Sequence, residues 1–379
     1  MVPLNHSLRL LTLLYICSLP LRADVLQFFD PTKEHKPSVL TSKLSYFIAN
    51  DTISLEEFFG DWQAHYHPRA GKNIAIQDFR VDIGGRFYKD FYLGFFHKYN
   101  VFVEANKDFA DLYHTIKNKE DFYHDRDYLL NLDIQGVKYS GLVLSKNSLL
   151  FKDSENSIMI GGALSLSFGH DIQEGTVRGR ATSPSEKMYQ VQAQSTYHYT
   201  DNHLYDSDVK GANGFGYGAD IALAYTNSRY DFGIKLIAND VFSRIYWRDL
   251  PYSFVDIQTE NKTFDKDGYV KYSPAISGLE KYTDFTQHIE ARYKLIFEKK
   301  IYEDAVLSGG LARSYGENFP YVRFDEALSE EQDVGFSYES RFDSFGFDYR
   351  YKSFMIGLST DALSDPSVFA LRSSFQLQF

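Results

Sequence analysis

Two short motifs contain residue types that could bind a metal ion. His65 and His67 are one residue apart, so a strand would place both imidazoles on one face, as a transition-metal site requires. Pro68 follows them, and no carboxylate is adjacent. Residues 265–268, Asp-Lys-Asp-Gly, begin like an EF-hand calcium loop, but its twelfth position, which should be a bidentate glutamate, is Ile276. We therefore interpret both motifs as loops and predict neither a metal site nor a cofactor.

The sequence gives little support for catalysis. Serine and histidine are plentiful, but the Gly-x-Ser-x-Gly turn that exposes a nucleophilic serine is absent. His198 and His288 have no acidic residue beside them in sequence that would commit them to general-base chemistry. We predict that the protein is not an enzyme, although members of a catalytic triad can be far apart in the chain.

Charged side chains that alternate with apolar ones are the strongest functional signal. Such a pattern would place both signs of charge on the inner face of a barrel, where a transverse field screens solutes in a hydrated pore. The alternative is that these charges pair with one another and fill a closed lumen. The predicted lumen-facing residues are Arg80, Asp82, Arg86, Asp220, Asp231, Lys235, Glu290, Arg292, Lys294 and Arg372.

The elements that would position these charges are β-strands of about ten residues. Residues 158–168 and 285–297 alternate strictly between apolar and small or polar side chains, which is the period of a strand. A tilted strand of this length crosses the hydrocarbon core of a membrane. Aromatic residues bracket several strands, for example Phe215 and Tyr225, as interfacial girdles would require. Alternation alone does not separate a sandwich from a membrane barrel, but the two chain ends favour the barrel.

The C-terminal strand, residues 369–379, places Phe375, Leu377 and Phe379 on one face and polar residues on the other. A chain that ends in this way resembles bacterial outer-membrane β-barrel proteins. The resemblance implies that these three residues form the insertion signal read by the barrel-insertion machinery. It also implies that the protein lies in the bacterial outer membrane, in contact with outer-membrane lipid.

The N-terminus predicts export. Residues 1–23 contain an apolar run that ends in a small residue, Ala23, suitable as a cleavage site, which is typical of a secretory signal peptide. The only cysteine, Cys17, lies within it, so the mature chain has no thiol chemistry. The net charge of −11 argues against a nucleic-acid partner. Residues 24–72 could be a tail, a plug or a first strand, and residues 73–379 are assigned to the barrel.

The predicted fold is all-β: an antiparallel transmembrane β-barrel of roughly 14 strands, within a range of about 12 to 16. Residues 214–240, with the pattern Gly-x-Gly-x-Gly-x-Asp and a later Asn239-Asp240 pair, resemble a strand pair of the long-chain fatty-acid transporter superfamily and of conjugal-transfer-type barrels. The expected function is a channel or transporter for small solutes. Two alternatives stay open: a structural or assembly barrel for secretion or surface interaction, and a transporter of lipophilic ligands with an N-terminal plug.

Overall fold

A computed structural model describes most of the chain, and no helix within its described part is both long and apolar enough to span a membrane. The predicted signal peptide with Cys17 and the motif at residues 265–268 lie outside the described residues. The described residues are 26–33, 40–58, 60, 62, 65–88, 91–201, 210–259, 262–264, 270–272, 276–362 and 367–379.

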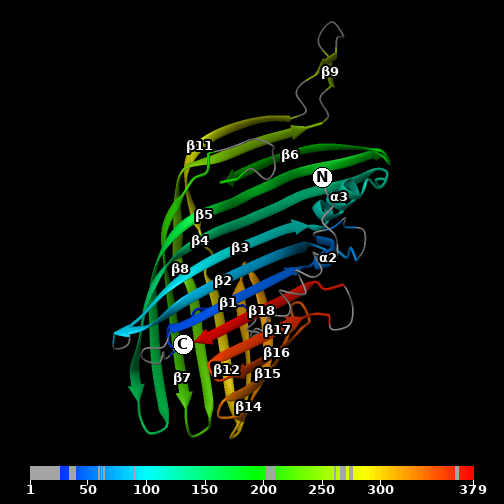
Figure 1. Cartoon of the computed structure of the whole chain (residues 1–379). Coiled ribbons are helices and arrows are strands. Elements are labelled where there is room, and N and C mark those ends of the chain that lie inside the picture. The colour runs from blue at the N-terminus through cyan, green and yellow to red at the C-terminus, as the bar shows by residue number, and fades with distance from the viewer. Residues whose placement is uncertain are drawn as a thin grey trace, which may run out of the picture.

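The structure consists almost entirely of antiparallel strands (Figure 1). The first half of the sheet contains β1 (Leu40–Asn50), β2 (Lys72–Tyr88), β3 (Phe91–Asn106), β4 (Arg126–Lys152), β5 (Asn156–Ser185), β6 (Met188–Tyr199), β7 (Gly214–Asn227) and β8 (Phe232–Gln258). The second half contains β11 (Ile276–His288), β12 (Arg292–Tyr302), β13 (Ala305–Ser314), β14 (Glu317–Ser329), β15 (Gln332–Glu339), β16 (Ser344–Tyr351), β17 (Phe354–Thr360) and β18 (Ala370–Gln378). A small separate hairpin pairs β9 (Lys262–Phe264) with β10 (Val270–Tyr272).

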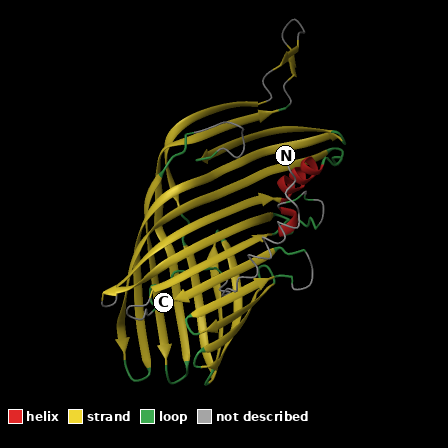
Figure 2. Cartoon of the chain, in the orientation of Figure 1, coloured by secondary structure: helices red, strands yellow, loops and turns green. Residues whose placement is uncertain are grey.

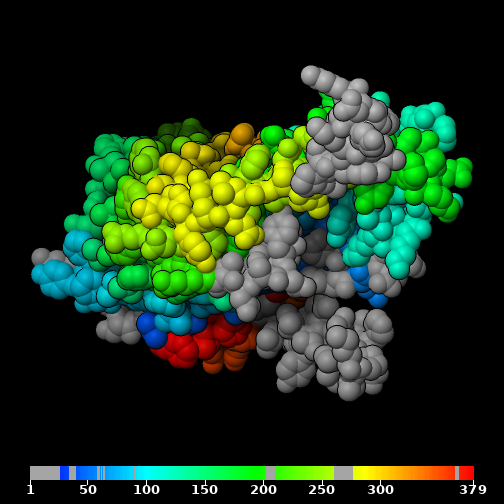
Figure 3. Space-filling view, turned by 90° about the horizontal axis from the view of Figure 1, so that it is seen from above, coloured from blue at the N-terminus to red at the C-terminus, as the bar shows by residue number. Residues whose placement is uncertain are grey.

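The strands close into a barrel, because β1 pairs with β2 on one side and with β18 on the other. In the view from above, the blue residues of β1 accordingly lie beside the red residues of the C-terminal strand (Figure 3). The closed wall has 14 strands, because β6 and β7 together pair with β5, and β11 and β12 together pair with β8. The prediction of an antiparallel barrel of about 14 strands is confirmed.

The wall has apolar side chains on its outer face and charged side chains on its inner face, the reverse of a soluble protein. The outward face is apolar, with Leu164 at 69% exposure and Phe347 at 45%, whereas Arg80 and Arg292 on the inward face are at 3% and 5%. Exposed apolar surface on this scale indicates contact with lipid. The chain is therefore a transmembrane barrel of the outer-membrane type, as predicted.

The two ends of the barrel differ. Tight turns join β7 to β8, β12 to β13 and β14 to β15 at the end where the C-terminus lies, and most connections at the opposite end are longer. Short turns are typical of the periplasmic end and long loops of the extracellular end. The short helices α2 (Leu55–Phe58) and α3 (Lys107–Asn118) lie at the long-loop end (Figure 2). The wall is also uneven, since β4 and β5 have 27 and 30 residues whereas β16 and β17 have 8 and 7.

Helix α3 is fixed to the tall side of the wall by its cap and by Asp111. The Asn106 side chain accepts a hydrogen bond from the Phe109 N–H, which caps the helix start. Burial alone would raise the pKa of Asp111, but hydrogen bonds and ion pairs with Lys107 and Arg126, together with a bond from the Tyr66 hydroxyl, outweigh it. The pKa of Asp111 therefore lies below its ordinary value.

Candidate functional site

The candidate site is in the lumen, where residues 26–33 run between the walls; we call these residues the lumenal segment. Two wall residues hold its backbone. Asn239 on β8 accepts a hydrogen bond from the Phe29 N–H and donates one to the Phe29 carbonyl, each 2.8 Å long. Arg292 on β12 donates to the Gln27 carbonyl at 3.0 Å. The segment therefore contacts the wall through its peptide groups as well as through its side chains.

The apolar side chains of the lumenal segment insert into two clusters on different parts of the wall. Leu26 and Phe28 belong to a cluster with residues of β1, β2, β3, β8 and β14, whereas Phe29 belongs to a cluster with residues of β3, β4, β5 and β8. The rings of Phe29 and Tyr92 are 5.6 Å apart, and the Arg292 guanidinium lies 4.9 Å from the Phe28 ring. The segment thus completes the apolar filling of the lumen at this depth.

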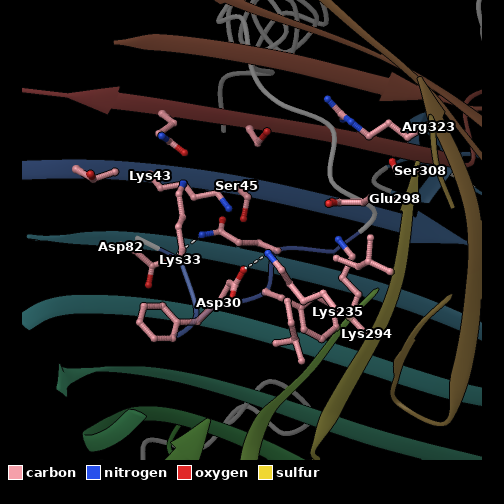
Figure 4. Close-up of a pocket in the computed structure, with 18 of the residues that line it drawn as sticks. Asp30, Lys33, Lys43, Ser45, Asp82, Lys235, Lys294, Glu298, Ser308 and Arg323 are labelled. Atoms are coloured by element: carbon pink, nitrogen blue, oxygen red, sulfur yellow. Dashed lines mark hydrogen bonds and ion pairs between the residues drawn. The ribbon is translucent and has the colours of Figure 1, made fainter. Parts of the chain in front are cut away.

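Two polar side chains of the lumenal segment bind charged groups of the wall. The Asp30 carboxylate lies 2.8 Å from the Lys235 ammonium, and Figure 4 shows the two facing each other. Gln27 donates a hydrogen bond to the Asp82 carboxylate at 2.6 Å. All of these interactions are non-covalent and individually modest, so the segment can leave without breaking a covalent bond.

Buried ion pairs surround the segment and cross the lumen. Arg292 on β12 lies 3.0 Å from Asp78 on β2, and these strands are on nearly opposite sides of the barrel. Lys98 on β3 binds both oxygens of Asp240 on β8, at 2.9 and 3.0 Å. Arg80 binds Asp82 through two hydrogen bonds of 2.7 and 2.8 Å. These ion pairs and the lumenal segment occupy the same part of the lumen.

A cavity of about 340 Å³, lined by both apolar and charged side chains, lies between the lumenal segment and the inner faces of β1, β8, β12, β14 and β18 (Figure 4). Arg323 projects into it and pairs with Asp325 at 2.7 Å and also with Asp348. The charged residues that line it are Asp30, Lys33, Lys43, Asp82, Lys235, Lys294, Glu298, Arg323 and Asp325. Its wall therefore carries both signs of charge and suits a polar part of a solute.

A second set of ion pairs crosses the long-loop mouth. Arg341, in the turn after β15, binds Asp51 at 2.8 and 2.7 Å and Glu317 at 3.1 Å. Lys72 on β2 joins Glu104 at 2.6 Å to Glu317 at 3.2 Å. The loop after β1 is thereby tied to β14 and to the turn after β15.

The predicted lumen-facing residues separate into two groups. Arg80, Asp82, Asp220, Lys235, Arg292 and Lys294 gather around the lumenal segment, with Asp220 accepting the Asp240 N–H at 2.8 Å, and Arg372 is buried against the Phe47 ring. Arg86 is half-buried near the short-turn end of β2. Glu290 lies in the connection between β11 and β12 and accepts the Gly316 N–H. Asp231 is exposed in the turn before β8, so its predicted place on the inner wall is wrong.

The predicted set includes Asp82, Lys235 and Arg292, which bind the lumenal segment, but it lacks Asp78, the partner of Arg292, and Asn239. Asp78 continues the alternation of Arg80 and Asp82 and could have been found from it. The Asn239-Asp240 pair did not predict a contact with the lumenal segment, because asparagine beside aspartate is also typical of a turn.

Two further sequence motifs are the C-terminal strand and the pair of histidines before β2. In the C-terminal strand, Phe375 and Leu377 alternate with the buried Arg372, Ser374 and Gln376, and Phe379 is exposed. His65 and His67 lie in the loop before β2, and within the described part of the chain no group of three potential metal ligands comes together.

No family model matches this chain, and no curated protein matches it. Several solved structures are similar to it. A TodX monoaromatic hydrocarbon channel mutant has 10% identity and a TM-score of 0.42, covering 90% of this chain and 88% of its own. The Ralstonia pickettii toluene transporter TbuX has 8% identity and a TM-score of 0.35, covering 91% and 89%. The Escherichia coli outer membrane protease OmpT has 9% identity and a TM-score of 0.25, covering 92% and 99%.

Proposed function

We propose that the protein is a gated conduit of the outer membrane for small solutes and that the lumenal segment is its gate. The observation that carries this proposal is a chain segment held in the lumen by reversible contacts beside a cavity of about 340 Å³. Sites for small molecules commonly have volumes of this order. Displacement of the segment would join the cavity to the rest of the lumen.

The mid-lumen favours solutes with an apolar part. Leu26, Phe28 and Phe29 leave an apolar space between two clusters when they move, whereas charged side chains also line the adjoining cavity. This combination supports an amphipathic solute and the version of the transporter hypothesis in which the N-terminal region acts as a plug. A purely structural barrel is the competing function, and it requires that the same contacts never open.

Transport is also supported over catalysis. One serine–histidine arrangement lies on the barrel wall: the Ser140 hydroxyl is 2.8 Å from His97 Nδ1 and 3.0 Å from His170 Nε2. His97 and His170 lie on the outward face beside apolar side chains such as Leu142 and Phe168. A hydrolytic site would need a water-filled cleft and an orienting acid, and the lipid-facing wall provides neither environment.

The test is single-channel conductance of the refolded protein in a planar bilayer. One variant replaces residues 26–30 by Gly-Ser-Gly-Ser-Gly, which removes the apolar side chains, Gln27 and Asp30 from the segment while it keeps the chain length. A control carries serine at Glu330 and Glu331, exposed turn residues at the short-turn end. We expect rare openings in the unaltered protein and the control, and steady conductance in the replacement variant. Silence in all three proteins would refute the conduit and favour a permanently filled barrel, whereas equal steady conductance would show that the segment is not the gate.

A further inference from the structure

We infer that the lumenal segment occupies the protein's own solute site and that this site takes small molecules with an aromatic ring beside an amide and a carboxylate. The inference rests on the proposed conduit function and names its solute class. It follows from three adjacent sets of contacts, which the wall makes to a ring, a peptide group and an acid in the order Phe28-Phe29-Asp30.

The amide part of the site is Asn239. Its side chain is only 1% exposed, and both its carbonyl oxygen and its amino group bind the Phe29 backbone. A buried amide without a donor and an acceptor opposite it is unfavourable, so the vacated site selects a molecule that supplies both. An amino-acid residue with an amide bond on each side does so through its own N–H and carbonyl, as Phe29 does, whereas a plain hydrocarbon supplies neither.

The ring part of the site is built from cations and aromatic side chains. The Phe28 ring lies 4.9 Å from the Arg292 guanidinium and 5.8 Å from the Lys294 ammonium. The Phe29 ring contacts Tyr92 and lies 6.0 Å from the Arg80 guanidinium. Cations above a ring face favour an aromatic group over an aliphatic group of equal size.

The acid part of the site is Lys235, which binds the Asp30 carboxylate at 2.8 Å where the lumenal segment borders the cavity. A solute carboxylate placed there would keep contact with the cavity while its ring lies in the apolar space. N-acylated dipeptides with an aromatic residue before an acidic residue present these groups in the same order as Phe29-Asp30.

The experiment uses Trp247 as the reporter, because it belongs to the same apolar cluster as Phe29. The other tryptophan, Trp62, is replaced in a Trp62→Phe background. In that background, the Phe28→Ala/Phe29→Ala chain is titrated with N-acetyl-Phe-Asp and with N-acetyl-Leu-Asp. We expect saturable quenching of Trp247 emission at least tenfold tighter for the phenylalanine probe. We expect at least tenfold weaker binding of that probe when the two phenylalanines are retained, because the segment then competes.

Asn239→Ala in the same double variant is the second test and should weaken binding of the phenylalanine probe at least tenfold. Equal binding of the two probes, or no effect of Asn239→Ala, would overturn the inference. Conductance of the same double variant separates this failure from failure of the conduit. Openings without selective binding would support the proposed conduit and contradict the proposed solute site. Selective binding without openings under any condition would support the solute site and contradict the conduit.

Discussion

The substitution Asn239→Ala tests whether the hydrogen bonds of one buried side chain hold the gate closed. The change deletes the two 2.8 Å hydrogen bonds between the Asn239 amide and the Phe29 peptide group and leaves that peptide group buried without these partners. The other anchors of the lumenal segment, including the Asp30–Lys235 ion pair, remain. We expect a less stable closed state, because water can form hydrogen bonds with the Phe29 N–H and carbonyl only after the segment has moved.

The size of the effect follows from the two bonds. Each contributes about 0.5–1.5 kcal/mol net, so their loss destabilises the closed state by about 1–3 kcal/mol. Since about 1.4 kcal/mol corresponds to a tenfold change in an equilibrium constant, the ratio of open to closed states should rise by roughly 5- to 150-fold. The larger value applies if the peptide group stays dry in the closed variant.

The assay is the open probability of single channels in planar bilayers at fixed salt and voltage. Asn131→Ala is the matched control, because Asn131 lies on the exposed extension of β4 at the long-loop end, outside the lumen. Both variants should retain the strand content and heat-modifiable gel mobility of the unaltered barrel. An open probability of folded Asn239→Ala within twofold of the control would refute the assignment of Asn239 to the gate.

Three further results are expected from single sites. A Cβ atom at Gly169 would lie 2.6 Å from the Trp247 ring, so Gly169→Ala should destabilise the barrel by about 1–3 kcal/mol in urea unfolding, and an unchanged midpoint would contradict this packing. Phe379→Ala removes a side chain that is 67% exposed, so it should reduce barrel assembly in cells without changing the stability of refolded protein, and a stability loss of equal size would contradict a signalling role. Because the pKa of Asp111 is lowered on folding, its contribution to docking of α3 is complete above its ordinary pKa of about 4 and is lost as pH falls through the lowered value. The hydrogen-exchange protection factor of α3, which is corrected for the intrinsic rise of exchange with pH, should therefore fall only in acid and should be insensitive to pH in Asp111→Asn, and a protection factor that falls on raising the pH would contradict it.

Much of the wall could be predicted from sequence because a membrane barrel imposes period-2 alternation on every strand. The C-terminal strand shows this clearly: Phe375 and Leu377 face outward, and Arg372 is buried. The error at Asp231 arose at a strand boundary, where alternation continues into a turn whose place is set by pairing of Asn227 with Phe232.

The lumenal segment and the interrupted wall strands could not be predicted in the same way. Residues 26–33 have no periodicity, and their partners, such as Asn239, lie about two hundred positions away, so only the folded barrel brings them together. The sequence also does not predict that β6 and β7 occupy one position in the wall. This is evident only from the structure, in which both pair with β5. Such features depend on pairing between distant strands, which the local pattern of residues does not predict.

The position of β1 at the closing seam has a consequence for assembly. Its pairing with β18 joins the two ends of the chain, so the barrel can close only after the last strand has been made. Only residues 34–39 connect the lumenal segment to β1, and a link of this length spans at most about 25 Å. The lumenal segment must therefore be near the seam when β1 and β18 meet, and filling of the lumen and closure of the wall become neighbouring steps of one maturation event. An outer membrane that inserts this protein would then receive it already shut, without an interval in which a newly closed barrel leaks.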